Sequence, residues 1–198
     1  MMRILFFGFM ALMALSQTGC SQNQGNYKYA VSDYKAMFSL PSTGADVKVD
    51  LVINYQIGDE NKSEGFKFVG ENQVADASCI SESGDKCTVE IQHLKETKII
   101  WHFAPARNTT KAVTVSFVIK DQLRRERVAN IFVAPWAGVF RVPVEKATYE
   151  IIFPQGMNPK IIQASPGVYE KNCSLGVCRL AVTQAPLVNR ELVVKYQE

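Results

Sequence analysis

Apolar and polar residues alternate with a period of two along much of this chain. The longest such run spans residues 47–57, where the apolar positions are Val47, Val49, Leu51, Ile53, Tyr55 and Ile57. Successive side chains of a strand point to opposite faces of a sheet, so this run predicts a strand with one buried and one wet face. After residue 20, no stretch of useful length has the apolar spacing of an amphipathic helix.

The same alternation, or a short run of β-branched and aromatic residues, marks the other expected strands. They are residues 35–40, 65–69, 86–91, 98–103, 112–120, 128–133, 147–153, 160–164, 176–182 and 191–196. Turn signals such as Pro154-Gln155-Gly156 separate many of them. We therefore predict an all-β fold in which residues 27–198 form one immunoglobulin-like antiparallel β-sandwich, with a closed antiparallel β-barrel as the alternative.

The N-terminal segment does not follow the strand pattern. Arg3 precedes twelve uncharged apolar residues, Ile4 to Leu15, which suit an export signal and fall short of the about 20 residues that span a bilayer. Ser16-Gln17-Thr18-Gly19-Cys20 then resembles the lipobox of bacterial lipoproteins, in which the cysteine carries a diacylglycerol. We expect residues 1–19 to be a signal peptide, Cys20 to be the lipid attachment residue, and residues 20–26 to hold that cysteine and a polar tether.

The lipobox resemblance implies an exported protein anchored to a membrane by lipid. It would lie at the periplasmic face, on the outer membrane in a cell with two membranes, or at the cell surface. Gln17 departs from the motif, because leucine is usual at that position. The alternative is ordinary secretion, with cleavage after the small residues Ala14 and Ser16.

The five cysteines are an odd number for an exported chain. With Cys20 assigned to lipid, four remain, and we expect disulfides between Cys79 and Cys87 and between Cys173 and Cys178. This local pairing closes one polar loop and one tight turn, although three pairings are open from sequence alone. The spacings of seven and four intervening residues are unlike those of a zinc knuckle, so no metal site is expected.

Charge and motifs argue against several functions. Residues 1–19 contain one base, Arg3, and no acid, so their removal lowers the formal charge from +3 to +2 and argues against a nucleic-acid partner. The sequence has no nucleophile elbow and no phosphate-binding glycine loop. Its two histidines, His93 and His102, lie in no catalytic motif. We predict a protein that is not an enzyme, with no catalytic residue and no cofactor.

Two segments are candidates for a binding surface. The first gathers aromatic residues around two backbone breakers: Phe132, Pro135, Trp136, Gly138 and Phe140. An exposed Trp136 would offer a platform for a sugar or a protein, whereas the favoured interpretation has Trp136 capping the core. The second is an expected charged hairpin tip over residues 121–127. An anionic partner could bind there to Arg124, Arg125 and Arg127.

Residues 112–156 resemble a known family. The similar segments are Val113-Thr-Val-Ser-Phe-Val-Ile119, Asn130-Ile-Phe-Val-Ala-Pro-Trp-Ala-Gly138, Val142-Pro143-Val144-Glu145 and Phe153-Pro154. They look like the extracytoplasmic N-terminal domain of the predicted membrane protein family called domain of unknown function 2207, and residues 34–55 resemble its opening strands. The resemblance implies a sandwich outside the cytoplasm and no particular activity. Members usually continue into transmembrane helices, so this chain is expected to be a stand-alone, lipid-tethered version.

From these patterns we expect a non-enzymatic, lipid-anchored envelope protein whose sandwich contacts another envelope protein or a glycan. The alternative is a barrel-type lipoprotein that holds a small apolar or sugar ligand in the interior cavity of a closed barrel. An envelope hydrolase is the third hypothesis, and no motif supports it.

Overall fold

The computed structural model describes residues 28–165, 169–184 and 191–198, which form strands β1 to β14. The predicted signal peptide, the lipid attachment residue Cys20 and the tether lie outside the described residues. In the described ranges, no helix has the length and apolar character needed to cross a membrane.

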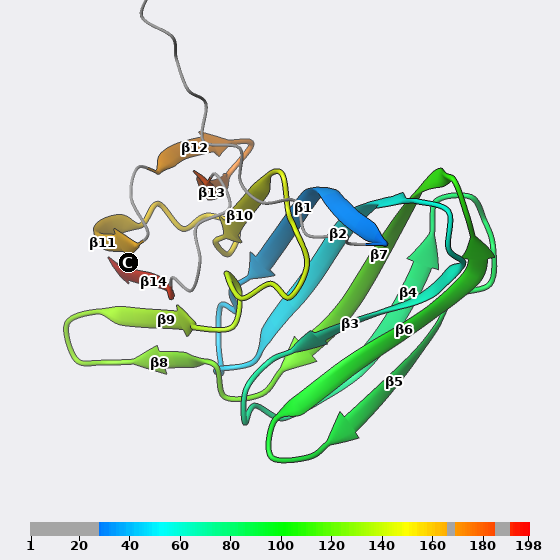
Figure 1. Cartoon of the computed structure of the whole chain (residues 1–198). Coiled ribbons are helices and arrows are strands. Elements are labelled where there is room, and N and C mark those ends of the chain that lie inside the picture. Colours follow the sequence, from blue (N-terminus) through cyan, green and yellow to red (C-terminus); the bar gives the residue numbers. More distant parts are fainter. Residues whose placement is uncertain (1–27, 166–168, 185–190) are drawn as a thin grey trace, which may run out of the picture.

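The largest sheet has seven strands in the order β12-β13-β10-β1-β2-β7-β4 (Figure 1). Their bounds are β1 Tyr29–Ser39, β2 Val47–Ile57, β4 Val74–Ser81, β7 Thr109–Ile119, β10 Ala147–Ile152, β12 Glu170–Ser174 and β13 Val177–Gln184. Neighbours run antiparallel except β1 and β10, which are parallel. The register places Leu51 of β2 opposite Ala36 of β1 and Val115 of β7, so the apolar positions of adjacent strands share one face.

Two smaller sheets cover this apolar face. The three-stranded sheet has the order β3-β6-β5, with bounds β3 Lys62–Phe68, β6 Thr97–Ala106 and β5 Thr88–His93. The four-stranded sheet has the order β11-β14-β9-β8, with bounds β11 Lys160–Ser165, β14 Leu192–Gln197, β9 Asn130–Ala134 and β8 Leu123–Arg125. Ring contacts join the layers: Tyr55 of β2 lies 5.7 Å from Phe103 of β6, and Phe38 of β1 lies 5.0 Å from Phe132 of β9.

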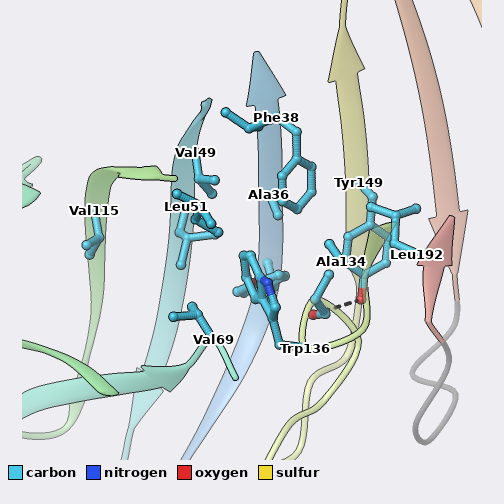
Figure 2. Close-up of a cluster of buried hydrophobic side chains, with 14 of the residues drawn as sticks. Ala36, Phe38, Val49, Leu51, Val69, Val115, Ala134, Trp136, Tyr149 and Leu192 are labelled. Carbon is cyan, nitrogen blue, oxygen red and sulfur yellow. Dashed lines mark hydrogen bonds between the residues drawn. The ribbon is translucent and has the colours of Figure 1, made fainter. Parts of the chain in front are cut away.

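One continuous apolar core therefore lies between the large sheet and the two small ones (Figure 2). The opposite face of the large sheet is polar and carries ion pairs. There the Glu150 carboxylate contacts the ammonium of Lys35 at 2.6 Å and the guanidinium of Arg179 at 3.0 Å. This division into a buried and a wet face is what the alternating sequence predicts.

The predicted all-β sandwich is confirmed, and the described strands form no closed barrel. Three strands appear where none was expected. β4 and β12 are edge strands, with few apolar residues to mark them, because only one side of an edge strand is paired. Residues 121–127 are not only a hairpin tip, since Leu123 is buried and begins β8.

Candidate binding pocket

The four described cysteines form two disulfides. Cys79 is bonded to Cys87, and Cys173 to Cys178 across the β12–β13 hairpin. This is the local pairing expected from the sequence. No group of three or more histidine, cysteine, aspartate or glutamate side chains is placed to hold a metal ion within the described ranges.

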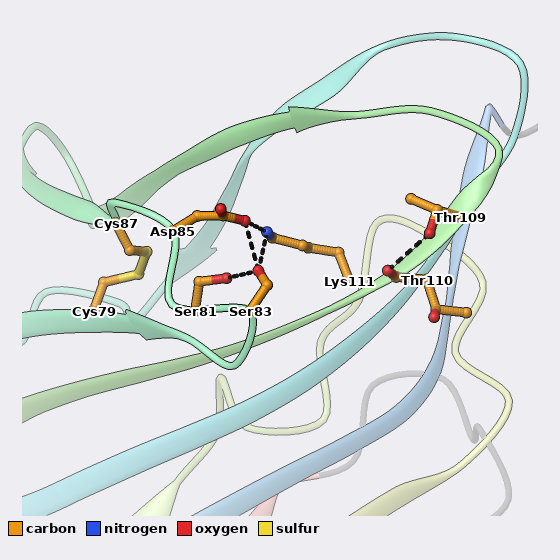
Figure 3. A network of polar contacts seen from close by, with 8 residues as sticks. All are labelled: Cys79, Ser81, Ser83, Asp85, Cys87, Thr109, Thr110 and Lys111. Atoms are coloured by element: carbon orange, nitrogen blue, oxygen red, sulfur yellow. Dashed lines mark hydrogen bonds and ion pairs between the residues drawn. A yellow bond between two sulfur atoms is a disulfide. The ribbon is translucent and has the colours of Figure 1, made fainter.

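A polar network lies beside the first disulfide (Figure 3). The buried Lys111 of β7 forms an ion pair with Asp85 and donates to the Ser83 hydroxyl at 2.5 Å, while Ser83 donates to Asp85 at 2.5 Å. The hydrogen bond from Lys111 lowers the pKa of the Asp85 carboxyl. The network fastens the disulfide loop to β7.

The two histidines lie on or beside the three-stranded sheet. His102 is half-exposed, with its ring nitrogens 3.8 Å from Glu64 and 3.9 Å from Glu90. His93 contacts the Thr97 hydroxyl at 3.4 Å. In the part of the chain that is described, neither ring is hydrogen-bonded to a serine or cysteine, so the geometry of a nucleophile and its base is not found there.

The three arginines do not act as one surface. Arg125 donates hydrogen bonds to the carbonyl oxygens of Pro41, Ser42 and Gly44 and pairs with Glu198 at 3.1 Å. Arg125 therefore links the turn between β1 and β2 to Glu198. Arg124 pairs with Glu126 at 3.1 Å, and Arg127 is exposed.

The aromatic segment is mostly buried. Phe132 is fully covered, Phe140 is half-buried, and Trp136 is only 5% exposed. The indole of Trp136 lies 5.8 Å from the ring of Phe38 and 6.2 Å from that of Phe117. Trp136 thus caps the core, as the favoured interpretation held, and the exposed platform is wrong.

A cavity of about 400 Å³ adjoins the capping tryptophan. The strands β1 and β2 line it on one side, β3 and β6 on another, and the segment before β10, residues 135–142, closes it. Most lining residues are aromatic or aliphatic: Tyr29, Val31, Tyr34, Ile53, Tyr55, Phe66, Phe68, Trp101, Trp136, Val139, Phe140 and Val142. The charged lining residues are Lys67, Glu96 and Arg141.

Lys67 is the charged residue in the wall that is buried, being 7% exposed. Its ammonium donates to the carbonyl oxygens of Ala137 at 3.2 Å and Val139 at 2.8 Å. It also lies over aromatic rings, 4.5 Å from the centroid of Phe140 and 5.3 Å from that of Tyr34. Burial lowers the pKa of Lys67 from 10.5 to about 7. The side chain thus links β3 to residues 135–142.

Two further polar atoms of the wall are buried without a partner. They are the Tyr34 hydroxyl and the indole nitrogen of Trp136. Burial raises the pKa of Tyr34 well above its ordinary value, so this hydroxyl keeps its proton. Tyr55 and Trp101 differ, because the indole N–H of Trp101 donates to the Tyr55 hydroxyl at 3.1 Å.

Sequence reasoning identified Trp136 and Phe140 but missed the rest of the pocket. In the strand over residues 62–68, alternation places Lys67 on the same face as Gly65, and both are buried. No sequence signal marked this lysine, because alternation with Phe66 and Phe68 places Lys67 on the polar face of the expected strand. Tyr34, Tyr55 and Trp101 carried no signal either, because aromatic residues are ordinary on the buried face of a strand.

No family model matches the sequence, and no curated protein matches it. The resemblance to domain of unknown function 2207 therefore stays a prediction. Solved structures do match. The M1 zinc metallopeptidase from Deinococcus radiodurans has a TM-score of 0.52 at 13% identity, over 87% of this chain and 43% of that one. Native yeast LTA4 hydrolase has a TM-score of 0.53 at 11% identity, over 94% of this chain and 33% of that one.

These similarities show the fold alone, because the identities are so low. The chain spans less than half the length of either of these structures.

Proposed function

We propose that this protein is an exported, lipid-anchored binding protein without catalytic activity, which holds a small apolar ligand in the pocket beside Trp136. The observation that carries the proposal is the cavity of about 400 Å³ with its mainly aromatic and aliphatic wall. Ligand sites are typically concave, largely apolar and about 300–1,000 Å³ in volume, with a few placed polar groups.

The cellular setting rests on the sequence and the disulfides. Two disulfides indicate an oxidising environment outside the cytoplasm. The lipobox-like segment ending at Cys20 supports a lipid anchor. The protein would thus present its pocket close to a membrane surface.

Binding without catalysis is supported by how the polar groups are used. Lys111, Ser83 and Asp85 bind one another, and Lys67 holds two backbone carbonyls. The expected contact with an envelope protein or a glycan had Trp136 and the arginines as its candidate surface, and the surroundings of these residues add nothing to it. The pocket supports a small ligand, although in a sandwich and not in the closed barrel of the alternative hypothesis.

The test uses a neutral fluorescent probe. N-phenyl-1-naphthylamine is an uncharged aromatic amine whose emission rises in apolar surroundings. The only two tryptophans of the chain, Trp101 and Trp136, both line the pocket, so bound probe should quench their emission by energy transfer. The experiment uses the full chain, purified with its anchor in detergent.

Val142→Phe should weaken binding of this probe by at least about tenfold, because Val142 lines the pocket and is half-buried. Val128→Phe is the matched control, because Val128 is exposed and lies outside the pocket wall. Failure of the folded wild-type protein to bind the probe, or equal binding by both variants, would overturn the proposal.

A further inference from the structure

The polar atoms of the pocket narrow the chemistry of its ligand. We propose that the pocket binds a small monocarboxylate with an aryl or branched-alkyl body, and that its carboxylate lies against the ammonium of Lys67. This inference rests on the proposed function.

The unpaired polar groups of the wall are hydrogen-bond donors. A lysine ammonium has three N–H groups, and Lys67 uses two of them on Ala137 and Val139. The indole N–H of Trp136 can only donate, and the Tyr34 hydroxyl has a proton to give. A buried donor without an acceptor is unfavourable. An acceptor oxygen on the ligand therefore suits the remaining N–H of Lys67, whereas the donors of Trp136 and Tyr34 are covered in this structure.

The unpaired positive charge of Lys67 also favours an anionic ligand. No carboxylate among the described residues is ion-paired with Lys67, whose displaced pKa has burial as its cause. Glu96 and Arg141 also line the pocket, but both are exposed, and the guanidinium of Arg141 lies 4.5 Å from the ring centroid of Phe68. A buried cation without a counter-ion is costly, and an entering anion removes that cost.

The single ammonium of Lys67 and the apolar wall around it together indicate which kind of anion fits the pocket. One buried ammonium matches one negative charge, whereas a phosphate dianion is usually held by several cations or backbone N–H groups. A sugar needs donors and acceptors in similar number, and this wall has mainly donors to offer. The aromatic side chains around Lys67 suit an apolar body, which the volume of about 400 Å³ limits to a small molecule.

The experiment compares probes that share the same apolar part and differ only in their polar group. 3-Phenylpropionate is titrated against 3-phenylpropanamide and 3-phenylpropanol, with tryptophan emission and calorimetry as readouts on the full chain in detergent. We expect the carboxylate to bind at least about tenfold more tightly than either neutral probe. N-acetylphenylalanine tests the source of the group: if it binds more tightly than 3-phenylpropionate, the ligand is the C-terminal residue of a peptide, and otherwise it is a free acid.

Variants of the protein test the contact with the carboxylate separately from the contacts with the apolar part of the ligand. Lys67→Met keeps an apolar stem and should abolish the preference for carboxylate over amide. Lys98→Met is the matched control. The ammonium of Lys98 also lies over an aromatic ring, 4.7 Å from the centroid of Phe66, but Lys98 is not a pocket residue. Circular dichroism and binding of the neutral naphthylamine probe show that each variant retains its fold and pocket.

The outcomes are distinguishable. If the naphthylamine probe binds and 3-phenylpropionate binds no better than its amide, this inference fails and the proposed function stands. Wild-type carboxylate affinity in Lys67→Met would also overturn it. If the naphthylamine probe does not bind the wild-type protein, the proposed function fails as well.

Discussion

Lys67 is the residue at which the fold and the proposed function meet. It is a buried cation that tethers residues 135–142 through two backbone carbonyls and faces three aromatic rings. A lysine in such a place is costly, because its ammonium has left water without gaining an ion-pair partner. We infer that this cost is retained for binding.

The first prediction concerns Lys67 and pH. Its pKa is about 7 in the folded protein and 10.5 ordinarily, so between these values the unfolded chain holds a proton that the folded chain lacks. Stability therefore rises with pH in this window, by at most about 1.4 kcal/mol per pH unit from this group. Lys67→Met should lose this contribution, as measured by urea unfolding at pH 7 and pH 9.

Lys98→Met serves as the control and should keep the wild-type dependence. The raised pKa values of Tyr34 and Tyr55 leave their hydroxyls protonated in the folded protein at both pH values. The same change in unfolding free energy between pH 7 and pH 9 in wild type and Lys67→Met would contradict the prediction.

A second prediction at the residue scale concerns Gly65. A Cβ at this position would collide with the Tyr55 hydroxyl and the indole of Trp101, which are hydrogen-bonded to each other. Gly65→Ala should destabilise the fold by about 1–3 kcal/mol through overpacking. The measurement is the free energy of unfolding in urea.

A double-mutant cycle tests that cause. Tyr55→Phe removes one of the colliding atoms, so Gly65→Ala should cost less in the Tyr55→Phe background than in the wild type. Equal costs in both backgrounds would show that the Tyr55 hydroxyl is not the cause and would assign the effect to the indole of Trp101.

Among the elements, the connection between β4 and β5, which lie in different sheets, is secured in two ways. The Cys79–Cys87 disulfide closes the connection between these strands, and the Lys111–Asp85 ion pair ties the same loop to β7. A covalent link and an ion pair with a buried lysine are independent constraints on one loop.

The third prediction separates these constraints. Replacing both Cys79 and Cys87 by alanine should lower stability by on the order of 2–3 kcal/mol, the chain-entropy value for a short loop. Backbone amides of residues 80–86 should exchange hydrogen only modestly faster, because Lys111 still holds the loop. Adding Lys111→Met should then raise exchange there much more than elsewhere in the protein.

Hydrogen exchange measured by mass spectrometry provides the readout, and Lys111→Met alone is the control. If the double cysteine variant already exchanges these amides as fast as the triple variant, the ion pair contributes nothing to the loop.

At the scale of the whole molecule, a membrane anchor would fix where the pocket works. The anchor and the pocket are separate features, since Cys20 precedes the sandwich in sequence and the pocket is lined by residues from Tyr29 to Val142. A short polar tether would leave the sandwich close to the lipid surface. Small carboxylates released at or crossing that membrane would be within reach.

The fourth prediction tests the anchor. Cys20→Ser should move the protein from the membrane fraction to the soluble fraction, because acyl chains contribute about 0.8 kcal/mol per buried methylene. Ligand affinity should stay unchanged. Intact mass should show a diacylglycerol-modified chain beginning at Cys20 in the wild type, and an unmodified polypeptide beginning at Met1 would contradict it.

The comparison with solved structures adds a point about the fold. A metallopeptidase structure and a hydrolase structure, both of much greater length, contain a similar fold at 11–13% identity. Very different sequences thus form a similar fold. A fold shared at this distance carries no activity with it.

The sequence by itself determined most of the strands of this protein and favoured the disulfide pairing that the structure has. A period of two needs only local geometry, and the run over residues 47–57 became β2 with the predicted bounds. The cysteine pairs are eight and five residues apart, so chain proximity already favoured them. Edge strands such as β12 were missed, because an edge strand with exposed side chains needs no apolar pattern.

Only the tertiary structure decided the pocket. Its walls come from residues as far apart as Tyr34, Lys67 and Trp136, which meet because the three-stranded sheet and residues 135–142 close over β1 and β2. The alternation of apolar and polar residues in a strand predicts which side chains point inward. It does not predict which groups they contact there. Whether a buried lysine meets a carboxylate, a carbonyl or an open cavity depends on sheet order and packing, which are set by contacts between distant parts of the chain.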